Sequence, residues 1–262
     1  MADYLMRDAA PLTDEEWAHL DKVVVETARR FLVGRRFVEI HGPYGAGLET
    51  VPVGTGEGRK HIELTGIEES FMLYWRDIEA SRQMGVHLEL GLAAQAAMAC
   101  ARAEDELIFD GFLKAANTSV ALGDWTQVDA PLANVVEATQ KLFADGFFGP
   151  YAVVLSPVLY TQTQRVSRGM GRTVGKLIAE VADGGMFRSA LLKDGQGLVV
   201  SLGAYNFDLV VGQDLITACR RLELAAERGW MIAAEAALRD YRRIAVAFSE
   251  RLSESVRFVP ED

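Results

Sequence analysis

Three glycines near the start of the chain follow an apolar stretch, as they do in loops that cradle a phosphate. They stand at positions 42, 45 and 47 of "RFVEIHGPYGAG". A P-loop carries Lys and then Ser or Thr after its last glycine, because these side chains hold phosphate and magnesium. Here Leu48 and Glu49 follow, and the order G-x-x-G-x-G, with Pro43 inside it, is not the G-x-G-x-x-G of a dinucleotide site. We therefore expect no phosphate site in this loop.

The residues that could bind a metal or act as a nucleophile are isolated from one another. Glu16 and His19 form one E-x-x-H pair, whereas carboxylate-bridged di-iron proteins use two such pairs and two further glutamates. The other histidines stand at positions 41, 61 and 87, without an H-E-x-x-H motif or a cysteine at ligand spacing. There is no G-x-S-x-G serine motif, and Cys100 in its alanine-rich stretch is expected to be a small core residue. The sequence predicts no metal site and no cofactor.

A cluster of carboxylates in "AEDELIFDG" is the remaining candidate for acid–base chemistry. Its members are Glu104, Asp105, Glu106 and Asp110. Adjacent positions on a helix point to different faces, so the cluster does not form a carboxylate pair by spacing alone. We expect a solvated surface or a salt bridge between subunits, and we predict that the protein is not an enzyme.

Composition sets broad limits on the protein. Its 262 residues, 50% of them hydrophobic, are enough for a sizeable core in one large domain or two closely joined ones. No apolar run is long enough to span a membrane, and the first residues do not resemble a secretory signal. The two cysteines, Cys100 and Cys219, lack paired spacing and are expected to be reduced in a cytosolic protein. The net charge of −10 makes nucleic acid an unlikely partner.

The first half of the chain contains two helical patterns separated by an extended segment. Thr13 can cap a helix, with Glu16 as its capping-box partner, and Gly34 is the expected stop. Residues 51–80 are rich in glycine, polar residues and aromatic residues, which predicts an extended, strand-rich excursion. Residues 87–117 have few helix breakers and predict a helix about 45 Å long at roughly 1.5 Å per residue.

The second half shows an alternating α/β pattern. Asp129 and Pro131 open a helix that Gly146 ends, and Ser156 precedes another helix. Strands are expected at "YAVVL", at "MFRSALL" and "GLVVSLG" around the turn "KDGQ", and at "FDLVVGQDL". The segment "WMIAAEAALRDYRRIAVAF" fits strand or helix, and the charged residues 249–262 are expected to form a mobile tail.

Five segments, taken in order, resemble the encapsulin (linocin-type) family. They are "APLTDEEW", "GRRFVEIHGPYG", "AEDELIFDG", "DGFFGPYAVVLSP" and "LVVGQDL", and the similarity covers most of residues 9–220. The family consists of bacterial and archaeal shell proteins with the fold of tailed-phage major capsid proteins. The resemblance therefore implies an α+β fold with a peripheral domain, an axial domain and an extended loop, and it implies that the glycines of the opening loop serve chain reversal.

The resemblance also implies a domain plan. In it, residues 1–50 form the N-terminal helix and the start of the peripheral domain, 51–80 the extended loop, 81–129 the peripheral domain with its spine helix, 130–212 the axial domain, 213–248 the return to the peripheral domain and 249–262 the C-terminal tail. The loop is expected to reach over neighbouring subunits. Its candidates for that interface are Phe71, Leu73 and Trp75, and the alternative is that they line the chain's own core.

Family members capture cargo enzymes through a short apolar peptide at the cargo's C-terminus. By matching motif, the residues that the resemblance implies for this site are Leu32, Arg35, Glu39, Asp214, Leu215 and Ile216. Leu32, Leu215 and Ile216 would form an apolar groove. Arg35 and Glu39 would flank the peptide or pair with each other, although Glu39 is longer than the acid often found at its position.

The loop "RVSRGMGR" falls where the family's axial domain approaches a symmetry axis. Its pore candidates are Arg165, Arg168, Gly169, Met170, Gly171 and Arg172. A ring of arginines could favour anions or repel cations, unless acids such as Glu180 offset it. The alternative is pairing with a carboxylate of a neighbouring subunit.

The function implied by the resemblance is a self-assembling icosahedral shell that encloses a ferritin-like protein or a dye-decolourising peroxidase in the cytoplasm. Iron storage or defence against oxidative stress would be its role. Two other functions stay open at this point. One is a phage-derived capsid protein that packages DNA, which the acidic composition disfavours. The other is a secreted bacteriocin or enzyme, which lacks support from a signal peptide or a catalytic set of residues.

Overall fold

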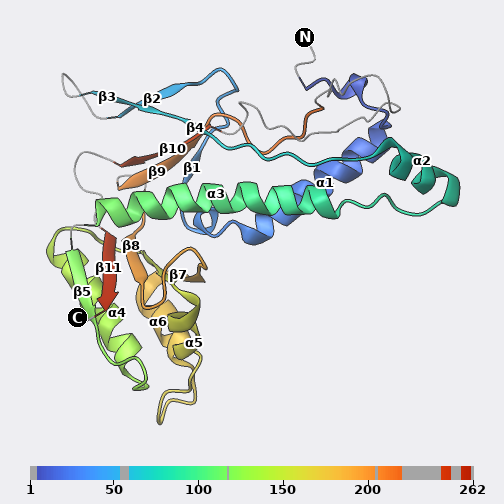
Figure 1. Cartoon of the computed structure of the whole chain (residues 1–262). Helices are drawn as coiled ribbons and strands as arrows, with labels where there is room; N and C mark the ends of the chain where they lie inside the picture. The colour runs from blue at the N-terminus through green and yellow to red at the C-terminus, as the bar shows by residue number, and fades with distance from the viewer. Residues whose placement is uncertain are drawn as a thin grey trace.

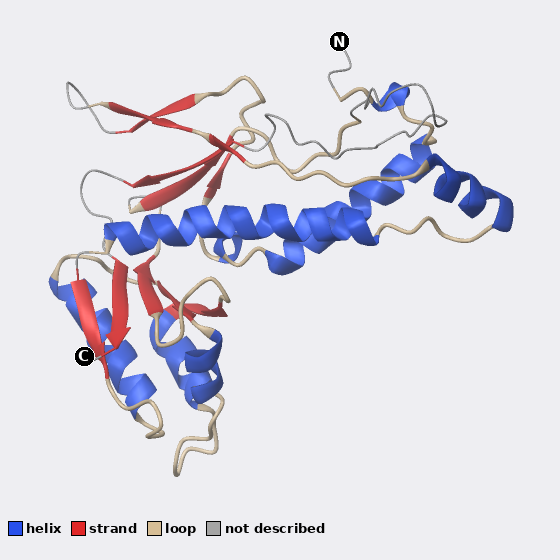
Figure 2. Ribbon diagram, viewed as in Figure 1, coloured by secondary structure: helices blue, strands red, loops and turns tan. Residues whose placement is uncertain are grey.

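The computed structural model describes residues 5–53, 59–116, 118–203 and 206–219, together with the backbone of residues 243–248 and 255–260. One long helix, α3 (Gly91–Ala115), runs across the molecule. A four-stranded sheet lies on one side of it, and a five-stranded sheet with three helices lies on the other (Figure 1). Figure 2 shows the same separation by element type, with α1 lying along α3.

Helix α1 (Asp14–Phe31) begins as the sequence predicts, at a capping box. The Thr13 side chain accepts from the Glu16 backbone N–H, and the Glu16 carboxylate accepts from the Thr13 N–H. Four apolar residues at helical spacing, Trp17, Leu20, Val24 and Ala28, are buried on one face of α1. This face packs against α3. The helix ends at Phe31, before the predicted stop, and Gly34 begins the short 3-10 helix η2 (Gly34–Arg36).

Helix α3 confirms the long helix that the sequence predicts. Its 25 residues give a length of about 37 Å at roughly 1.5 Å per residue. Gly91 is its first residue, and the helix continues through Gly111. The preceding helix α2 (Trp75–Met84) was not predicted, since this stretch was expected to be extended. Helix-forming residues follow the aromatic residues Tyr74 and Trp75. Gly85, with a φ of 64°, ends the helix.

The four-stranded sheet joins distant parts of the chain in the order β1-β9-β10-β4. Its strands are β1 (Ile40–His41), β9 (Phe207–Val211), β10 (Arg243–Phe248) and β4 (Thr65–Gly66). β1 is parallel to β9, and β10 is antiparallel to both β9 and β4. β10 shows that the C-terminal segment is extended at residues 243–248. The rest of the segment "WMIAAEAALRDYRRIAVAF", residues 230–242, lies outside the described residues.

The glycine loop after β1 has a structural role. Gly42 has a φ of +119°, and a Cβ placed on it would lie 2.2 Å from the carbonyl oxygen of Val211 in β9. Beyond it, the N–H of Tyr44 donates to the Val211 carbonyl and the N–H of Gly45 to that of Gly212. Glycine at position 42 therefore allows the loop to approach β9, as expected from a chain reversal.

A two-stranded antiparallel sheet follows this loop. β2 (Thr50–Val53) and β3 (Lys60–Glu63) pair in register from Thr50 opposite Glu63. Figure 1 shows this hairpin projecting above the four-stranded sheet. The first part of the predicted extended segment is therefore strand, and its last part is helix α2.

The five-stranded sheet has the order β5-β11-β8-β6-β7. Its strands are β5 (Thr118–Leu122), β6 (Tyr151–Leu155), β7 (Asp183–Arg188), β8 (Gly197–Ser201) and β11 (Ser255–Pro260). Helices α4 (Ala130–Ala144), α5 (Pro157–Gln162) and α6 (Val174–Ala182) accompany it. Every residue of β6 and β8 is buried, which explains their unbroken apolar sequences.

Two details of this sheet correct the sequence analysis. β7 and β8 flank the turn at "KDGQ" but are not neighbours, because β6 lies between them. Residues 255–260 are not a mobile tail, since they form β11 between β5 and β8. The domain plan, with its axial segment 130–212, stays a prediction; β5 precedes that segment and joins this sheet, and β9 lies within it and joins the other sheet. Pairing between strands far apart in sequence cannot be read from local patterns.

Candidate functional site

A groove lies between α1 and the chain segment that follows β9. Its volume is about 290 Å³, and we call it the α1 groove. It is lined by Leu5, Arg7, Asp21, Val24, Val25, Leu215, Ile216 and Thr217. Val25 lies beside the buried stripe of α1 and is only partly covered. The apolar part of the groove could accept the side chains of an extended apolar peptide.

A network of polar groups forms one wall of the α1 groove. The Arg7 guanidinium donates to both carboxylate oxygens of Asp21, each at 2.9 Å. It also donates to the Thr217 carbonyl at 3.0 Å and hydroxyl at 2.9 Å, and it lies 4.8 Å from the ring centre of Trp17. This fork-shaped pairing fixes the 217 segment to α1. The charges of Arg7 and Asp21 in this wall balance each other. The selectivity of the groove for a ligand therefore depends on its apolar lining.

Of the residues that the sequence analysis assigned to the cargo site, Leu215 and Ile216 line this groove. Leu32 does not, because it is buried in the apolar cluster between α1 and α3. Asp214 lies next to the groove lining and is held by Arg35, whose Nη1 is 3.1 Å from its Oδ1. Two of the three apolar residues predicted for the cargo site, Leu215 and Ile216, therefore lie together in the α1 groove.

Arg35 has a different partner from the one predicted. Its Nε donates to Glu104 Oε1 at 2.5 Å and its Nη2 to Oε2 at 3.3 Å. The Glu104 side chain is completely buried, and that of Arg35 is 15% exposed. Burial acts to lower the pKa of Arg35, but the bond to Glu104 and the charges of Glu104 and Asp214 outweigh it, so the pKa is raised. Arg35 therefore links α3 to the 214 segment, and the proposed pairing with Glu39 is wrong.

Asp105, the neighbour of Glu104, caps the turn that follows α1. Its carboxylate accepts from the backbone N–H groups of Val33 and Gly34, both at 2.8 Å. Burial raises its pKa to about 6, against the lowering effect of these two hydrogen bonds. A side chain on Gly34 would meet Ile108 at 2.7 Å, so glycine allows this close approach.

The expectation that these two carboxylates lie on a solvated surface or between subunits is therefore wrong. The signal that could have placed them is the spacing of their neighbours. Ala101, Glu104, Asp105, Ile108 and Phe112 follow the 3–4 residue repeat of a single helix face, and all five are buried. Acids inside an apolar stripe require partners, and those partners are contributed by the turn after α1.

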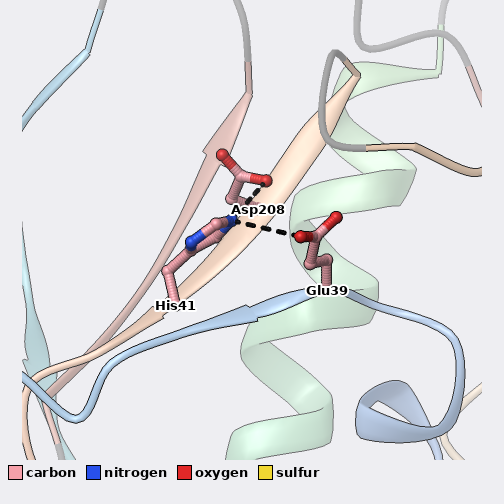
Figure 3. Close-up of side chains that lie close together, drawn as sticks. All are labelled: Glu39, His41 and Asp208. Atoms are coloured by element: carbon pink, nitrogen blue, oxygen red, sulfur yellow. Dashed lines mark ion pairs between the residues drawn. The ribbon is translucent and has the colours of Figure 1, made fainter.

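Glu39 lies away from the α1 groove, in a cluster that the sequence analysis missed. Its carboxylate points toward the imidazole of His41, and the Asp208 carboxylate approaches the same Nε2 atom of that ring (Figure 3). The two-residue spacing of Glu39 and His41 along an extended strand puts them on one face. Asp208 comes from a distant strand, so no local motif joins it to them.

The predicted pore loop connects α5 to α6. Gly169 and Gly171 have φ values of 79° and 63°, as a tight turn requires. Met170 is 61% exposed, and Arg168 is exposed. Arg165 donates to the carbonyl of Thr126 at 2.5 Å.

Arg172 forms an ion pair with Glu180 of the same chain. Glu180 thus offsets Arg172 in the way the sequence analysis allowed, and Arg168 is the remaining exposed arginine of the predicted ring.

The predicted interface residues of the extended loop divide into two groups. Phe71 and Leu73 are 7% and 4% exposed and belong to the apolar cluster between α1 and α3. The structure corrects the interface prediction for these two residues, since they cover the chain's own core. Trp75, at the start of α2, is 47% exposed. It remains the candidate for contact with a neighbouring subunit.

Within the described residues, no helix combines the length and the apolar character needed to cross a membrane. Both cysteines, Cys100 and Cys219, are buried thiols, as expected of core residues. The cytosolic location remains a prediction.

Comparison with known proteins was made by sequence and by structure. The family model "Linocin_M18: Encapsulating protein for peroxidase" matches residues 2–223. The type 1 encapsulin shell protein EncA of Myxococcus xanthus is 41% identical over 248 residues, covering 83% of this chain and 86% of that protein. A diheme-cytochrome-encapsulin shell fusion protein of Kuenenia stuttgartiensis is 32% identical over 232 residues; the match covers 78% of this chain and 64% of the fusion protein.

Two solved structures share the architecture. A virus-like particle from Pyrococcus furiosus matches with a TM-score of 0.73 and 13% identity, over 94% of this chain and 99% of that one. The capsid of Myoviridae phage XM1 matches with a TM-score of 0.61 and 12% identity, over 88% and 92% of the two chains. At such identities the likeness establishes the fold alone. It confirms the prediction of an α+β, phage-capsid-like fold.

Proposed function

The chain belongs to the encapsulin family, and from this premise we propose that its shell takes up cargo by binding an apolar peptide at the cargo's C-terminus in the α1 groove. As an encapsulin shell protein it assembles into a capsid-like nanocompartment, and the shell protein is structural. We propose further that the compartment is icosahedral and that the groove faces its interior.

The α1 groove is the observation that carries this proposal. It combines an apolar lining, from Val25, Leu215 and Ile216, with a wall whose charges are already paired by Arg7 and Asp21. An apolar side chain entering it would remove apolar surface from water at about 25 cal/mol per Å². A peptide of alternating small and apolar residues fits such a site, because small residues let its backbone approach the wall.

We propose a redox enzyme as the class of cargo, with a dye-decolourising peroxidase first and a ferritin-like protein second. The description of the matching family refers to a peroxidase. The name of the Kuenenia relative joins a diheme cytochrome to an encapsulin shell. Both names support a redox protein as cargo. The peroxidase favours a role in oxidative-stress defence, and iron storage is the alternative with a ferritin-like cargo.

The test is co-expression with a fluorescent protein that carries a glycine- and leucine-rich C-terminal peptide. Shells of wild type, Val25→Asp and Ala18→Asp are purified, and fluorescence per shell is measured. Val25 lines the groove, whereas Ala18 is exposed on the same helix and serves as the matched control. We expect Val25→Asp to reduce loading at least tenfold and Ala18→Asp to leave it unchanged, with hollow particles in negative-stain images of both.

Equal loading of wild-type and Val25→Asp shells would refute the groove as the cargo site. If Val25→Asp fails to assemble, Val25→Thr keeps the shape of the side chain and replaces one methyl group by a hydroxyl. It should then lower loading by a smaller factor. Nuclease-resistant nucleic acid in the wild-type particles would instead favour the DNA-packaging alternative.

A further inference from the structure

Three side chains that could bind a metal meet at the edge of the four-stranded sheet. The His41 Nε2 atom lies 3.3 Å from Asp208 Oδ1 and 3.8 Å from Glu39 Oε1. One ligand atom from each residue lies within 4.8 Å of the other two. Figure 3 shows both carboxylates directed at the same nitrogen of the imidazole.

The backbone fixes this arrangement. Ile40 of β1 pairs with Leu209 of β9 in parallel, and the Leu209 N–H donates to the Glu39 carbonyl at 2.9 Å. Continuing this register by one residue places Glu39 beside Asp208. Because side chains alternate along a strand, His41 lies on the same face as both. His41 and Asp208 thus lie on two hydrogen-bonded strands, and Glu39 directly precedes the first of them.

Two polar atoms in the cluster lack a hydrogen bond. His41 Nε2 and Asp208 Oδ1 are both shielded from solvent, and among the described residues neither has a hydrogen-bond partner. Shielded polar atoms of this kind require a partner. The ion pairs found for Glu39 and Asp208 in the described part of the chain are those with His41. A cation between the three side chains would satisfy both atoms and neutralise the carboxylates.

We propose that Glu39, His41 and Asp208 form a site for a divalent transition metal of the Zn²⁺ type. Zn²⁺ binds imidazole nitrogen and carboxylate oxygen at about 2.0–2.2 Å, so ligand atoms on a tetrahedron lie about 3.3–3.6 Å apart. The His41–Asp208 separation already has this value, and the Glu39 oxygen needs only a side-chain rotation. The imidazole favours Zn²⁺ over Mg²⁺ or Ca²⁺, which prefer oxygen ligands.

Three protein ligands leave a fourth position for water. Glu39 also lines a pocket of about 330 Å³ beside Phe207 and Pro150, which gives solvent and ions access to its carboxylate. The metal would tie the edge strand β1 to β9. Since it binds the folded chain, it would stabilise that chain by mass action. This proposal is independent of cargo binding, because the α1 groove does not include these residues.

Zinc binding to purified empty shells tests the proposal. Wild type, His41→Gln, Asp208→Asn and the control His61→Gln are titrated with Zn²⁺ by isothermal calorimetry. Cobalt absorption in the visible range then reports the coordination geometry. His61 is an exposed histidine on β3, outside the cluster. We expect His41→Gln and Asp208→Asn each to weaken one site per chain at least about tenfold, and we expect His61→Gln to behave as wild type.

The same stoichiometry and affinity in wild type and His41→Gln would overturn the proposal. It would leave an ordinary ion pair at this position. If His41→Gln does not assemble, Glu39→Gln offers a second variant, since its side chain is 54% exposed and its loss disturbs no packing. A Zn²⁺-dependent rise in the unfolding temperature that is present in wild type and absent in Glu39→Gln would then support the site, and an equal rise in both would refute it.

Discussion

Replacement of Arg35 by alanine would remove the cation that pairs with a buried carboxylate. The Glu104 side chain is fully buried, and Arg35 donates to its two oxygens at 2.5 and 3.3 Å. Removing one partner of a buried ion pair costs about 3–5 kcal/mol, because the remaining charge stays away from water.

This cost corresponds to a lower unfolding temperature. With about 2–4 °C per kcal/mol for a chain of this size, the unfolding midpoint of Arg35→Ala should fall by roughly 6–20 °C at pH 7.

Circular dichroism melting of wild type, Arg35→Ala and Arg102→Ala at pH 7 provides the assay. Arg102 is the matched control, because it pairs with Glu106 at 3.1 Å on the same helix while both side chains are exposed. Its loss should cost less than about 1 kcal/mol. A loss of stability in Arg35→Ala no larger than that in Arg102→Ala would refute the account of Glu104 as a buried charge that Arg35 stabilises.

Further predictions concern the turn after α1, the glycine loop and the pore loop. Burial raises the pKa of Asp105 to about 6, so wild type should lose about 3 kcal/mol of stability as the pH rises from about 4 to 6; urea unfolding of Asp105→Asn should show a flatter profile. Gly42→Ala places a Cβ 2.2 Å from a β9 carbonyl and should lower the unfolding midpoint by several degrees, whereas Gly47→Ala, which meets nothing within 4 Å, should not. Arg168→Ala shells should admit cations faster than wild type in a stopped-flow influx assay. Arg172→Ala shells should admit them faster still, since this change frees the Glu180 carboxylate. Unchanged influx rates in both variants would count against a selective ring.

Local patterns in the sequence were sufficient for several elements. The capping box at Thr13, the long helix at 91–115 and the buried strand at 151–155 depend on short-range spacing, capping and runs of apolar residues. The phage-capsid-like fold followed from ordered motifs that span most of the chain, and the comparisons confirm it. The sequence was also sufficient to show that the glycine loop lacks a nucleotide-binding motif, because such motifs require particular residues at fixed positions.

The tertiary structure decided the contacts between residues far apart in the chain. In the folded chain Arg35 pairs with Glu104 and not with Glu39. Phe71 and Leu73 are buried against the chain's own helices, and β11 lies inside a sheet. The fold also brought Asp208 beside Glu39 and His41. In each case the partner is chosen by strand register and by packing across the core, and neither is encoded in the spacing of neighbouring residues. Sequence alone therefore identified the type of protein, whereas the pairing of its charged side chains required the fold.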